Sequence, residues 1–232
     1  MEVVISIGGS VLAPEITEEH ISRYAEAIEK MSKKHTVSIV VGGGKTAREY
    51  ISTAKEMGAN DSICDYIGID VTRINARLLI SALSTTEAQP YPEPPTSYRE
   101  AEDALADKKI PVMGGVAPGQ TTDAVAAVFS EYTDADLLIY ATSVDGVYTS
   151  DPRTNDDAEA LEVLTPEELV EIVMQTELSA GTNSVVDALA AKIIERSEIE
   201  TYVLDGEDAS NISRAALQGE FDGTTISPET SE

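Results

Sequence analysis

Four loops rich in glycine or small polar residues follow directly on short apolar runs of the sequence. They are Gly8-Gly9-Ser10, Gly42-Gly43-Gly44-Lys45-Thr46, Gly114-Gly115 and Thr142-Ser143-Val144-Asp145-Gly146. Glycine lets backbone N–H groups come close to an oxyanion, and a helix that begins at such a loop adds unpaired donors and a positive dipole end. One such loop is most often only a turn. Several at one edge of a sheet predict a site for several phosphate groups.

The second loop resembles a P-loop only in part. A P-loop needs the pattern G-x-x-x-x-G-K-[ST], and Gly44-Lys45-Thr46 supplies its end. The first glycine of the pattern would fall at Ile39, which lies inside an apolar run. The sequence therefore excludes a P-loop here.

The same loop does satisfy the dinucleotide fingerprint G-x-G-x-x-[GA], through Gly42, Gly44 and Ala47. The fingerprint normally follows the first strand, whereas here another glycine loop comes first. Its acid, expected about 20 residues further on, would be Asp61 or Asp65. A hydride-transfer enzyme is thus an alternative to a phosphate-transfer enzyme at this stage.

Short apolar runs alternate with stretches of helical spacing along the chain. The runs, rich in Val and Ile, are Val3–Ile7, Val37–Val41, Ile110–Met113, Leu137–Ala141 and Thr201–Leu204. The helical stretches are Glu18–Ser32, Ala47–Met57, Asp70–Ser84, Tyr98–Lys108, Asp123–Thr133, Pro166–Gln175, Val186–Arg196 and Ala209–Leu217. Such runs are typical of buried parallel strands, so the alternation predicts an α/β fold with a mostly parallel sheet covered on both faces.

The length of 232 residues fits one domain of the larger α/β kind, although two small domains would also fit. Two segments break the alternation. The proline-rich segment Gln89–Pro95 is expected to be a loop or an extended edge segment. The polar tail Thr224–Glu232 is expected to fray, at least after Ser227.

The chain is extremely acidic, with 42 Asp and Glu against 16 Lys and Arg and a formal net charge of −26. Nucleic acid phosphates should repel such a chain, which argues against DNA or RNA binding. The carboxylates are spread over the whole sequence. This favours a solvated surface adapted to high salt, which screens the self-repulsion, over a dedicated site for metal or for a basic partner.

The sequence contains no apolar run of about 18 residues, so no membrane span is expected. Its start, Met1-Glu2-Val3, lacks the basic residues of a secretory signal. The single cysteine, Cys64, cannot form an internal disulfide. A reducing cytoplasm is therefore the expected location.

Taken together, the glycine loops resemble those of the amino acid kinase superfamily, and in particular the archaeal-type uridylate kinases. The blocks that carry the resemblance are Ile7–Ser10, Val41–Lys45, Asp65–Ile69, Pro111–Gly115, Thr121–Ala124 and Val144–Tyr148, the last continuing to Asp151-Pro152. The resemblance extends from residue 1 to about Ile226. It implies a single three-layer α/β/α sandwich over residues 1–227, a frayed tail over 228–232, and assembly as a homohexamer.

The resemblance also implies an activity. It is the transfer of the γ-phosphoryl group of ATP to UMP, giving ADP and UDP in pyrimidine nucleotide biosynthesis. Mg²⁺ would be held mainly by nucleotide phosphates and water, with no metal ligand from the protein.

The resemblance also implies which residues form the site, position by position. The ATP site would comprise Gly8, Gly9, Ser10, Gly44, Arg48, Thr142, Tyr148 and Asp151. The UMP site would comprise Gly43, Asp65, Val116, Ala117, Pro118, Gly119, Gln120, Thr121 and Thr122. Ser10 and Arg48 would serve catalysis.

Several of these residues also have a simpler structural interpretation. An ionised Asp65 suits two ribose hydroxyls, but it could equally be a solvated loop acid. Thr121 or Thr122 can cap the helix that begins near them. Tyr148 could stack on adenine or fill core space. Lys45 could attract phosphate or pair with a neighbouring carboxylate.

Two positions depart from the superfamily pattern. Many members have a lysine two residues before the first Gly-Gly, where this chain has Ser6. Others have a second lysine after a later glycine turn, where this chain has Asp187; Lys192 lies further along. No catalytic lysine can be named. Phosphoryl transfer depends chiefly on positioning and charge stabilisation, which Arg48, Mg²⁺ and the backbone N–H groups of Gly9 and Ser10 could supply.

Other members of the superfamily fit less well. Isopentenyl phosphate kinases use a histidine near the second glycine loop, but the two histidines here, His20 and His35, both precede it, and Lys45 stands in that place. Acetylglutamate and carbamate kinases match the loop before Thr121 less closely. A non-catalytic binding protein on the same scaffold, such as a molybdate storage protein, would not be expected to keep both nucleotide half-sites.

Overall fold

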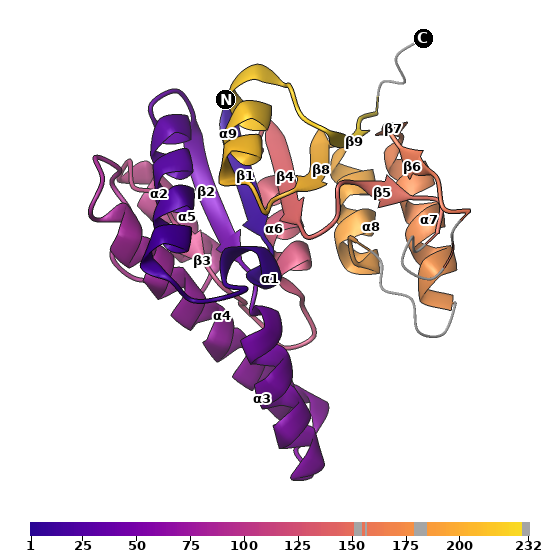
Figure 1. Ribbon diagram of the computed structural model, residues 1–232, viewed down its shortest axis with the longest axis horizontal. Coiled ribbons are helices and arrows are strands. Elements are labelled where there is room, and N and C mark those ends of the chain that lie inside the picture. Colours follow the sequence, from indigo (N-terminus) through magenta and orange to yellow (C-terminus); the bar gives the residue numbers. More distant parts are fainter. Residues whose placement is uncertain (151–154, 156, 179–184, 229–232) are drawn as a thin grey trace.

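The computed structural model describes residues 1–150, 155, 157–178 and 185–228. Within this part, a seven-stranded sheet has the order β3-β2-β1-β4-β8-β9-β7 (Figure 1). Its strands are β1 (Glu2–Ile7), β2 (Thr36–Val41), β3 (Val112–Met113), β4 (Leu137–Thr142), β7 (Val163–Leu164), β8 (Thr201–Asp205) and β9 (Gly223–Ile226). The strands from β3 to β8 pair in parallel, and only the β8–β9 pair is antiparallel. The predicted mostly parallel sheet is confirmed.

Helices cover both faces of this sheet. One core cluster joins the sheet to α2 (Glu18–Ser32), α4 (Asp61–Leu83) and α9 (Ala209–Gln218). The other joins it to α5 (Tyr98–Ala106), α6 (Thr122–Tyr132), α7 (Pro166–Leu178) and α8 (Ala188–Ser197). The arrangement is the three-layer α/β/α sandwich that the resemblance implied.

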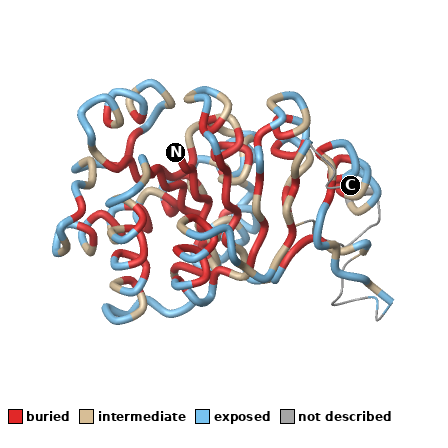
Figure 2. The backbone as a smooth tube through the Cα atoms, turned by 90° about the horizontal axis from the view of Figure 1, so that it is seen from above, coloured by how far each residue is buried: buried red, intermediate tan, exposed pale blue. Residues whose placement is uncertain are grey.

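Strand β1 shows how the sequence separates the two layers. Alternate side chains of a strand point to opposite faces. Val3, Ile5 and Ile7 join the cluster of α2, while Val4 joins the cluster of α6. Ser6 follows the same alternation and therefore points toward α6. The inner strands form the buried centre of the molecule (Figure 2).

The five predicted strands are confirmed, but four further ones had not been predicted. Strands β5 (Val147–Tyr148), β6 (Ala160–Leu161) and β7 have only two residues each, too few to show a periodic pattern. Strand β9 was assigned to the polar tail. Thr224 is in fact fully buried there, and its hydroxyl donates to Leu161 O and accepts Val147 N–H. Most of the predicted frayed tail, residues 229–232, lies outside the described residues.

Helix α4 begins nine residues earlier than predicted. Asn60 caps it by accepting Ile63 N–H at 3.0 Å, so Asp65 lies inside a helix and not in a loop. The first part of α4 packs against α3 (Gly44–Glu56), and the two project beyond the edge of the sheet (Figure 1). The apolar period is weak in this part because apolar side chains, Ile63 and Tyr66, also lie on its exposed side.

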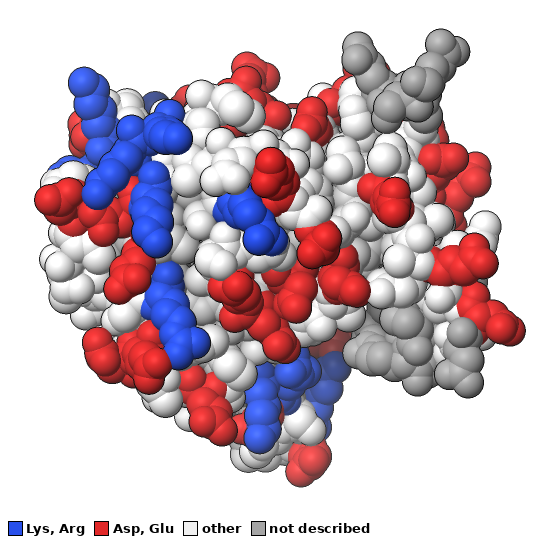
Figure 3. Space-filling view, turned by 45° about the horizontal axis from the view of Figure 1, so that its top comes forward, with Lys and Arg blue, Asp and Glu red and all other residues white. Residues whose placement is uncertain are grey.

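The acidic side chains are scattered over the whole of the face in Figure 3, whereas the basic ones gather on its left and lower parts. This distribution agrees with a solvated acidic surface. Across the described residues, no helix combines the length and the apolar character needed to cross a bilayer. Cys64 is buried and free.

Candidate active site

The first three glycine loops meet at the carboxyl ends of β1, β2 and β3, where open α/β sheets bind their ligands. They enclose a cleft of about 430 Å³. Its lining comes from the loops after β1, β2 and β3, from the helices α1 (Gly9–Leu12), α3 and α4, and from the start of α6 with the loop before it. The lining residues are Gly8, Gly9, Ser10, Gly42, Gly43, Gly44, Ala47, Arg48, Ile51, Asp65, Gly68, Ile69, Thr72, Gly115, Gln120, Thr121, Thr122 and Asp123. Residues predicted for both nucleotides therefore share one cleft.

The first two glycine loops lie backbone against backbone. A Cβ added to Gly9 would stand 2.1 Å from Gly44 N and 2.5 Å from Gly42 O. Gly44 has a φ of 63°, and a Cβ there would lie 2.5 Å from Gly9 O. These glycines are required because the loops touch each other, a reason the sequence did not reveal. Their contact sets the distance between the two halves of the cleft.

Ser10 and Arg48 join across this contact. Ser10 lies in the short helix α1 (Gly9–Leu12), and its hydroxyl accepts a hydrogen bond from Arg48 Nη2 at 3.3 Å. Arg48 is otherwise exposed, so its guanidinium is available to an anion in the cleft. Lys45 pairs instead with Glu49 at 3.6 Å, one of the two interpretations the sequence had left open.

The opposite wall is built on α4. Asp65 Oδ2 accepts a hydrogen bond from Gly119 N at 2.9 Å and so ties the helix to the loop before α6. Thr72 reinforces this tie, because its hydroxyl accepts Gly115 N–H at 2.7 Å. Asn75, buried, donates to Gly42 O at 2.9 Å. The late start placed Asp65 outside the predicted helix, whereas Thr72 and Asn75 lie within it. The contacts of these last two could not be predicted because they join segments far apart in the chain.

The loop before α6 leads into the N-terminus of that helix, which Thr121 caps. Thr121 Oγ accepts Ala124 N–H at 3.1 Å, which confirms the predicted cap. Gln120, Thr121 and Thr122 line the cleft, and Tyr98 holds Gln120 through a 3.1 Å hydrogen bond. The remaining residues predicted for the UMP site, Val116 to Gly119, are not among those lining the cleft. They are connected to the cleft only indirectly, through the hydrogen bond from Gly119 N–H to Asp65.

Asp123 lies at the floor of the cleft and was not among the predicted site residues. Its Oδ1 accepts a hydrogen bond from Ser6 Oγ at 3.1 Å, and its carbonyl accepts one from Tyr140 at 2.9 Å. Burial and the neighbouring Asp187 raise the pKa of Asp123 to about 7, while the Ser6 bond lowers it. The Thr121-Thr122-Asp123 block contained the signal, an acid at the start of a helix that follows a glycine loop.

Asp187 approaches the same floor from α8. Its Oδ1 caps that helix by accepting the N–H groups of Leu189 and Ala190, and its Oδ2 accepts the hydroxyl of Thr121. Ser6 and Asp187 are the two positions where the superfamily resemblance would place lysines. Both converge on Asp123, so two carboxylates and a hydroxyl occupy the place where those cations would stand.

Two of the three residues predicted for the ATP base and ribose, Thr142 and Tyr148, do not line this cleft. Thr142 closes the loop after β4, where its hydroxyl bonds Val144, and it does not line the cleft. Tyr148 is in β5 and donates to Asp145 at 2.7 Å, so it neither fills the core nor lines the cleft. Asp151 lies outside the described residues. The structure thus brings together the predicted phosphate side of the ATP site and leaves its base side undefined.

The dinucleotide alternative does not agree with the topology. Asp61 and Asp65, its candidate acids, both lie within α4 and not at the end of a strand. The loop with the fingerprint faces another glycine loop in place of an open crevice.

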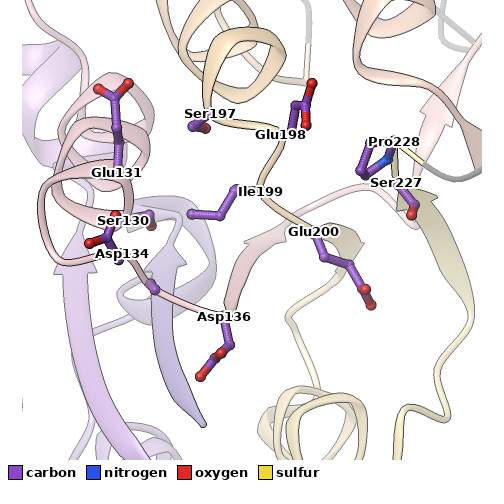
Figure 4. A pocket seen from close by; sticks show the side chains of 11 residues that line it. Ser130, Glu131, Asp134, Asp136, Ser197, Glu198, Ile199, Glu200, Ser227 and Pro228 are labelled. Carbon is purple, nitrogen blue, oxygen red and sulfur yellow. The ribbon is translucent and has the colours of Figure 1, made fainter.

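A second hollow, about 500 Å³, opens at the opposite edge of the sheet, before β4 and β8. Carboxylates from the ends of α6 and α8 surround it (Figure 4). They belong to Glu131, Asp134, Asp136, Glu198 and Glu200. This lining would repel phosphates, so the smaller cleft is the better candidate for a nucleotide site.

Comparisons with known proteins agree with the geometry. The model of the amino acid kinase family matches residues 1–205. A uridylate kinase of Methanococcoides burtonii is 54% identical over 218 residues, 94% of this chain and 92% of the relative. One of Haloarcula marismortui is 52% identical over 230 residues, 99% of this chain and 100% of the relative.

Solved structures of a uridylate kinase and a UMP kinase share the fold of this chain. The crystal structure of a uridylate kinase from Archaeoglobus fulgidus is similar with a TM-score of 0.87 and 48% identity, covering 98% of this chain and 100% of that one. A UMP kinase structure from Bacillus anthracis has a TM-score of 0.81 at 25% identity, covering 100% and 97%. The family match, the full-length relatives and the shared fold together establish that this chain belongs to the amino acid kinase family.

Proposed function

We propose that the chain is a UMP kinase, a nucleoside monophosphate kinase that transfers the γ-phosphoryl group of ATP to UMP in pyrimidine nucleotide biosynthesis. The observation that carries the proposal is the single cleft between Ser10–Arg48 on one side and Asp65–Gly119 on the other. Relatives named uridylate kinase, about half identical over nearly the whole chain, support the acceptor.

The reaction needs little covalent help from the protein. An oxygen of the UMP phosphate attacks the γ-phosphorus, and the bond from that phosphorus to the bridging oxygen of ADP breaks. Charge on the transferred group would be stabilised by Arg48 and by the backbone N–H groups of Gly9 and Ser10. No general base is needed, because the attacking phosphate is already anionic.

The acceptor side follows from α4 and the loop before α6. One carboxylate oxygen of Asp65 bonds Gly119, which leaves the other for a ribose hydroxyl. Gly43 faces the phosphate region, and Gln120, Thr121 and Thr122 offer polar groups for the base. Gly119 and the residues before it, Val116 to Pro118, would close over the ligand.

The floor of the cleft fits Mg²⁺. Asp123 offers a hard oxygen atom in the cleft, whereas no three potential ligands gather within the described part of the chain. Asp123 would therefore contribute a ligand, with phosphates and water completing the shell. Bound there, the ion would neutralise charge that develops on the phosphates. The expectation that nucleotide phosphates and water hold most of the ion stays a prediction.

Self-association is part of the proposal, with the homohexamer as the expected assembly. Helices α3 and α4 expose Tyr50, Met57, Ile63, Tyr66 and Ile74, which are 49 to 79% exposed, beside an apolar hollow of about 360 Å³. Residues 44–77 carry five basic and five acidic side chains, in a chain of charge −26. We infer a second copy as the occupant, since like faces meet at a two-fold axis and the balanced charge of residues 44–77 avoids the repulsion that the rest of this acidic chain would cause.

The self-association can be tested at Met57. Met57→Glu would place two extra charges at the two-fold contact and should convert the assembly to a smaller species in analytical ultracentrifugation. Met174→Glu, at a residue 45% exposed on α7, which packs with α8 in the other core cluster, is the matched control and should sediment as the wild type. Identical sedimentation of Met57→Glu and wild type would remove this face from the contact.

A coupled assay of ADP release tests the activity. It compares UMP with CMP, isopentenyl phosphate and acetylglutamate, in molar KCl because of the acidic surface. UMP should give the highest kcat/KM. Preference for isopentenyl phosphate or acetylglutamate would assign the chain to another kinase of its family, and no ADP with any acceptor would favour a binding or storage protein.

A further inference from the structure

A serine near the carboxyl end of strand β1 bonds directly to the floor of the cleft. Ser6 is only 2% exposed, with Ile5 and Ile7 on either side in β1. Its hydroxyl donates to Asp123 Oδ1 at 3.1 Å, across 117 residues of sequence. A buried donor to a carboxylate in such a site fixes the direction of that carboxylate.

The partner strand completes this support. Ser6 lies directly opposite Tyr140 of β4 in the parallel register. The hydroxyl of Tyr140 donates to the carbonyl oxygen of Asp123 at 2.9 Å. Tyr140 and Ser6, which are neighbours in the register, therefore both hold Asp123. Tyr140 bonds the backbone carbonyl of Asp123, and Ser6 bonds its carboxylate. The first turn of α6 is fixed relative to the sheet, and so is the carboxylate it carries.

The hydrogen bond leaves half of the carboxylate free. Oδ1 of Asp123 accepts from Ser6, whereas Oδ2 receives no hydrogen bond from any described residue. Asp123 lines the cleft between the predicted ATP and UMP sides. Its second oxygen is thus available to whatever is bound at the junction of the two nucleotides.

Burial alone does not explain the Ser6 bond. Ser38 of β2 lies opposite Val4, on the same face of the sheet as Ser6, and is fully buried. Its hydroxyl has no hydrogen-bond partner among the described residues. This layer tolerates an unpartnered serine, so the bond from Ser6 to Asp123 is a specific arrangement.

We propose that Ser6 is a positioning residue, whose hydroxyl aims Asp123 at the junction of the two nucleotide phosphates. The inference rests on the proposed phosphoryl transfer, to which it adds the residue that holds the acid. Ser6 would act only through Asp123 and would not touch either substrate. A hydroxyl at this position therefore has a different role from a lysine, which would reach the phosphates itself.

Steady-state kinetics of Ser6→Ala, Ser6→Thr and Ser38→Ala test the proposal. Ser6→Ala should lower kcat by about tenfold to a hundredfold, because the acid is no longer held in place. The KM values for UMP and ATP should stay within about twofold of wild type, since Ser6 touches neither substrate. Ser6→Thr, which keeps the hydroxyl, should recover most of kcat, and Ser38→Ala should match the wild type.

Crystal structures of the wild type and Ser6→Ala give a readout that does not depend on activity. The Asp123 carboxylate should hold one orientation in the wild type and a different or divided one in Ser6→Ala. If Ser6→Ala fails to fold, Ser6→Cys keeps the volume with a much weaker donor and takes its place.

The outcomes separate the inference from the function on which it rests. Wild-type kcat with an unmoved Asp123 in Ser6→Ala overturns the inference. An equal loss in Ser38→Ala also overturns it, because the effect would then come from packing. A wild-type protein that makes no UDP refutes the proposed function instead, and the orientation of Asp123 in the crystal still decides whether Ser6 positions it.

Discussion

At the scale of single residues, the site is organised around an acid that is partly neutralised by its surroundings. Asp123 has Asp187 nearby and a hydroxyl at Ser6, where a cation would be expected. Its raised pKa is a cost to folding at neutral pH, because the buried carboxylate must ionise there. Such a cost is typical of functional sites, where a bound ligand or ion offsets it.

Asp123→Asn should therefore change how the free energy of unfolding depends on pH. The folded chain binds the Asp123 proton more tightly than the unfolded chain, so this group favours folding in acid and loses its contribution as pH rises through about 7. In urea denaturation without nucleotide, Asp123→Asn should be more stable than wild type by about 2 kcal/mol at about pH 8, and by much less at about pH 5. The exposed Asp70→Asn is the control, and a gain that is the same at both pH values would contradict the assignment.

The two walls of the cleft should respond separately to substitution. Asp65→Asn should raise the KM for UMP about tenfold while leaving that for ATP nearly unchanged, because a hydrogen bond to a charged group is weakened on the acceptor side. Arg48→Ala should instead lower kcat about a hundredfold. Steady-state kinetics with each substrate varied decide this. Equal effects of Asp65→Asn on both substrates would show that the half-sites are wrongly divided.

Ser10, Arg48, Asp65 and Thr121 belong to sequence motifs, and these motifs predicted them as residues of the cleft that they line. Sequence reasoning missed Asp123, Thr72 and Asn75, because their roles come from contacts between segments far apart in the chain. It assigned Thr142 and Tyr148 to the ATP site by resemblance, and neither lines the cleft. Motif spacing identifies local chemistry, whereas a hydrogen bond across 117 residues depends on the register of the sheet.

At the scale of elements, the glycine loops act as a pair. Gly9 and Gly44 belong to loops after neighbouring strands, and the loops touch because β1 and β2 pair in register up to Ile7 and Val41. Any shift of one loop would move Ser10 relative to Arg48. The long apolar strands and regular helices were predictable from the sequence. The contact between the loops was not, because glycine gives the same signal for a ligand and for a neighbouring backbone.

Gly9→Ala should destabilise the chain and disrupt the site together. Its Cβ would meet backbone atoms, which cannot move aside, and the expected cost is about 3 kcal/mol with most of the activity lost. Gly8→Ala is the matched control for stability, since its Cβ would make only ordinary contacts from 3.4 Å outward. Urea denaturation compares the two. Similar small effects would mean that the loops can separate without cost.

At the scale of the whole molecule, charge is the dominant feature. A net charge of −26 spread over the surface repels itself, and dissolved salt screens this repulsion. Such a surface is expected of a protein that works at high salt. Residues 44–77, with five basic and five acidic side chains, depart from this pattern.

Stability should fall when salt is removed. Thermal unfolding in molar KCl should occur at a clearly higher temperature than in millimolar KCl, by about 10 °C or more, because many like charges are screened at once. NaCl should act in nearly the same way as KCl if screening is the cause. An unchanged Tm would mean that the acidic surface has another role.

The most direct test of the account follows the phosphoryl group itself. The purified chain is given UMP, Mg²⁺ and ATP labelled in its γ-phosphate, in molar KCl, and the products are separated. If the chain transfers the phosphoryl group to UMP, the label should appear in UDP in an amount equal to the ADP formed. Label found only in inorganic phosphate, or remaining in ATP, would contradict the transfer of phosphate to UMP.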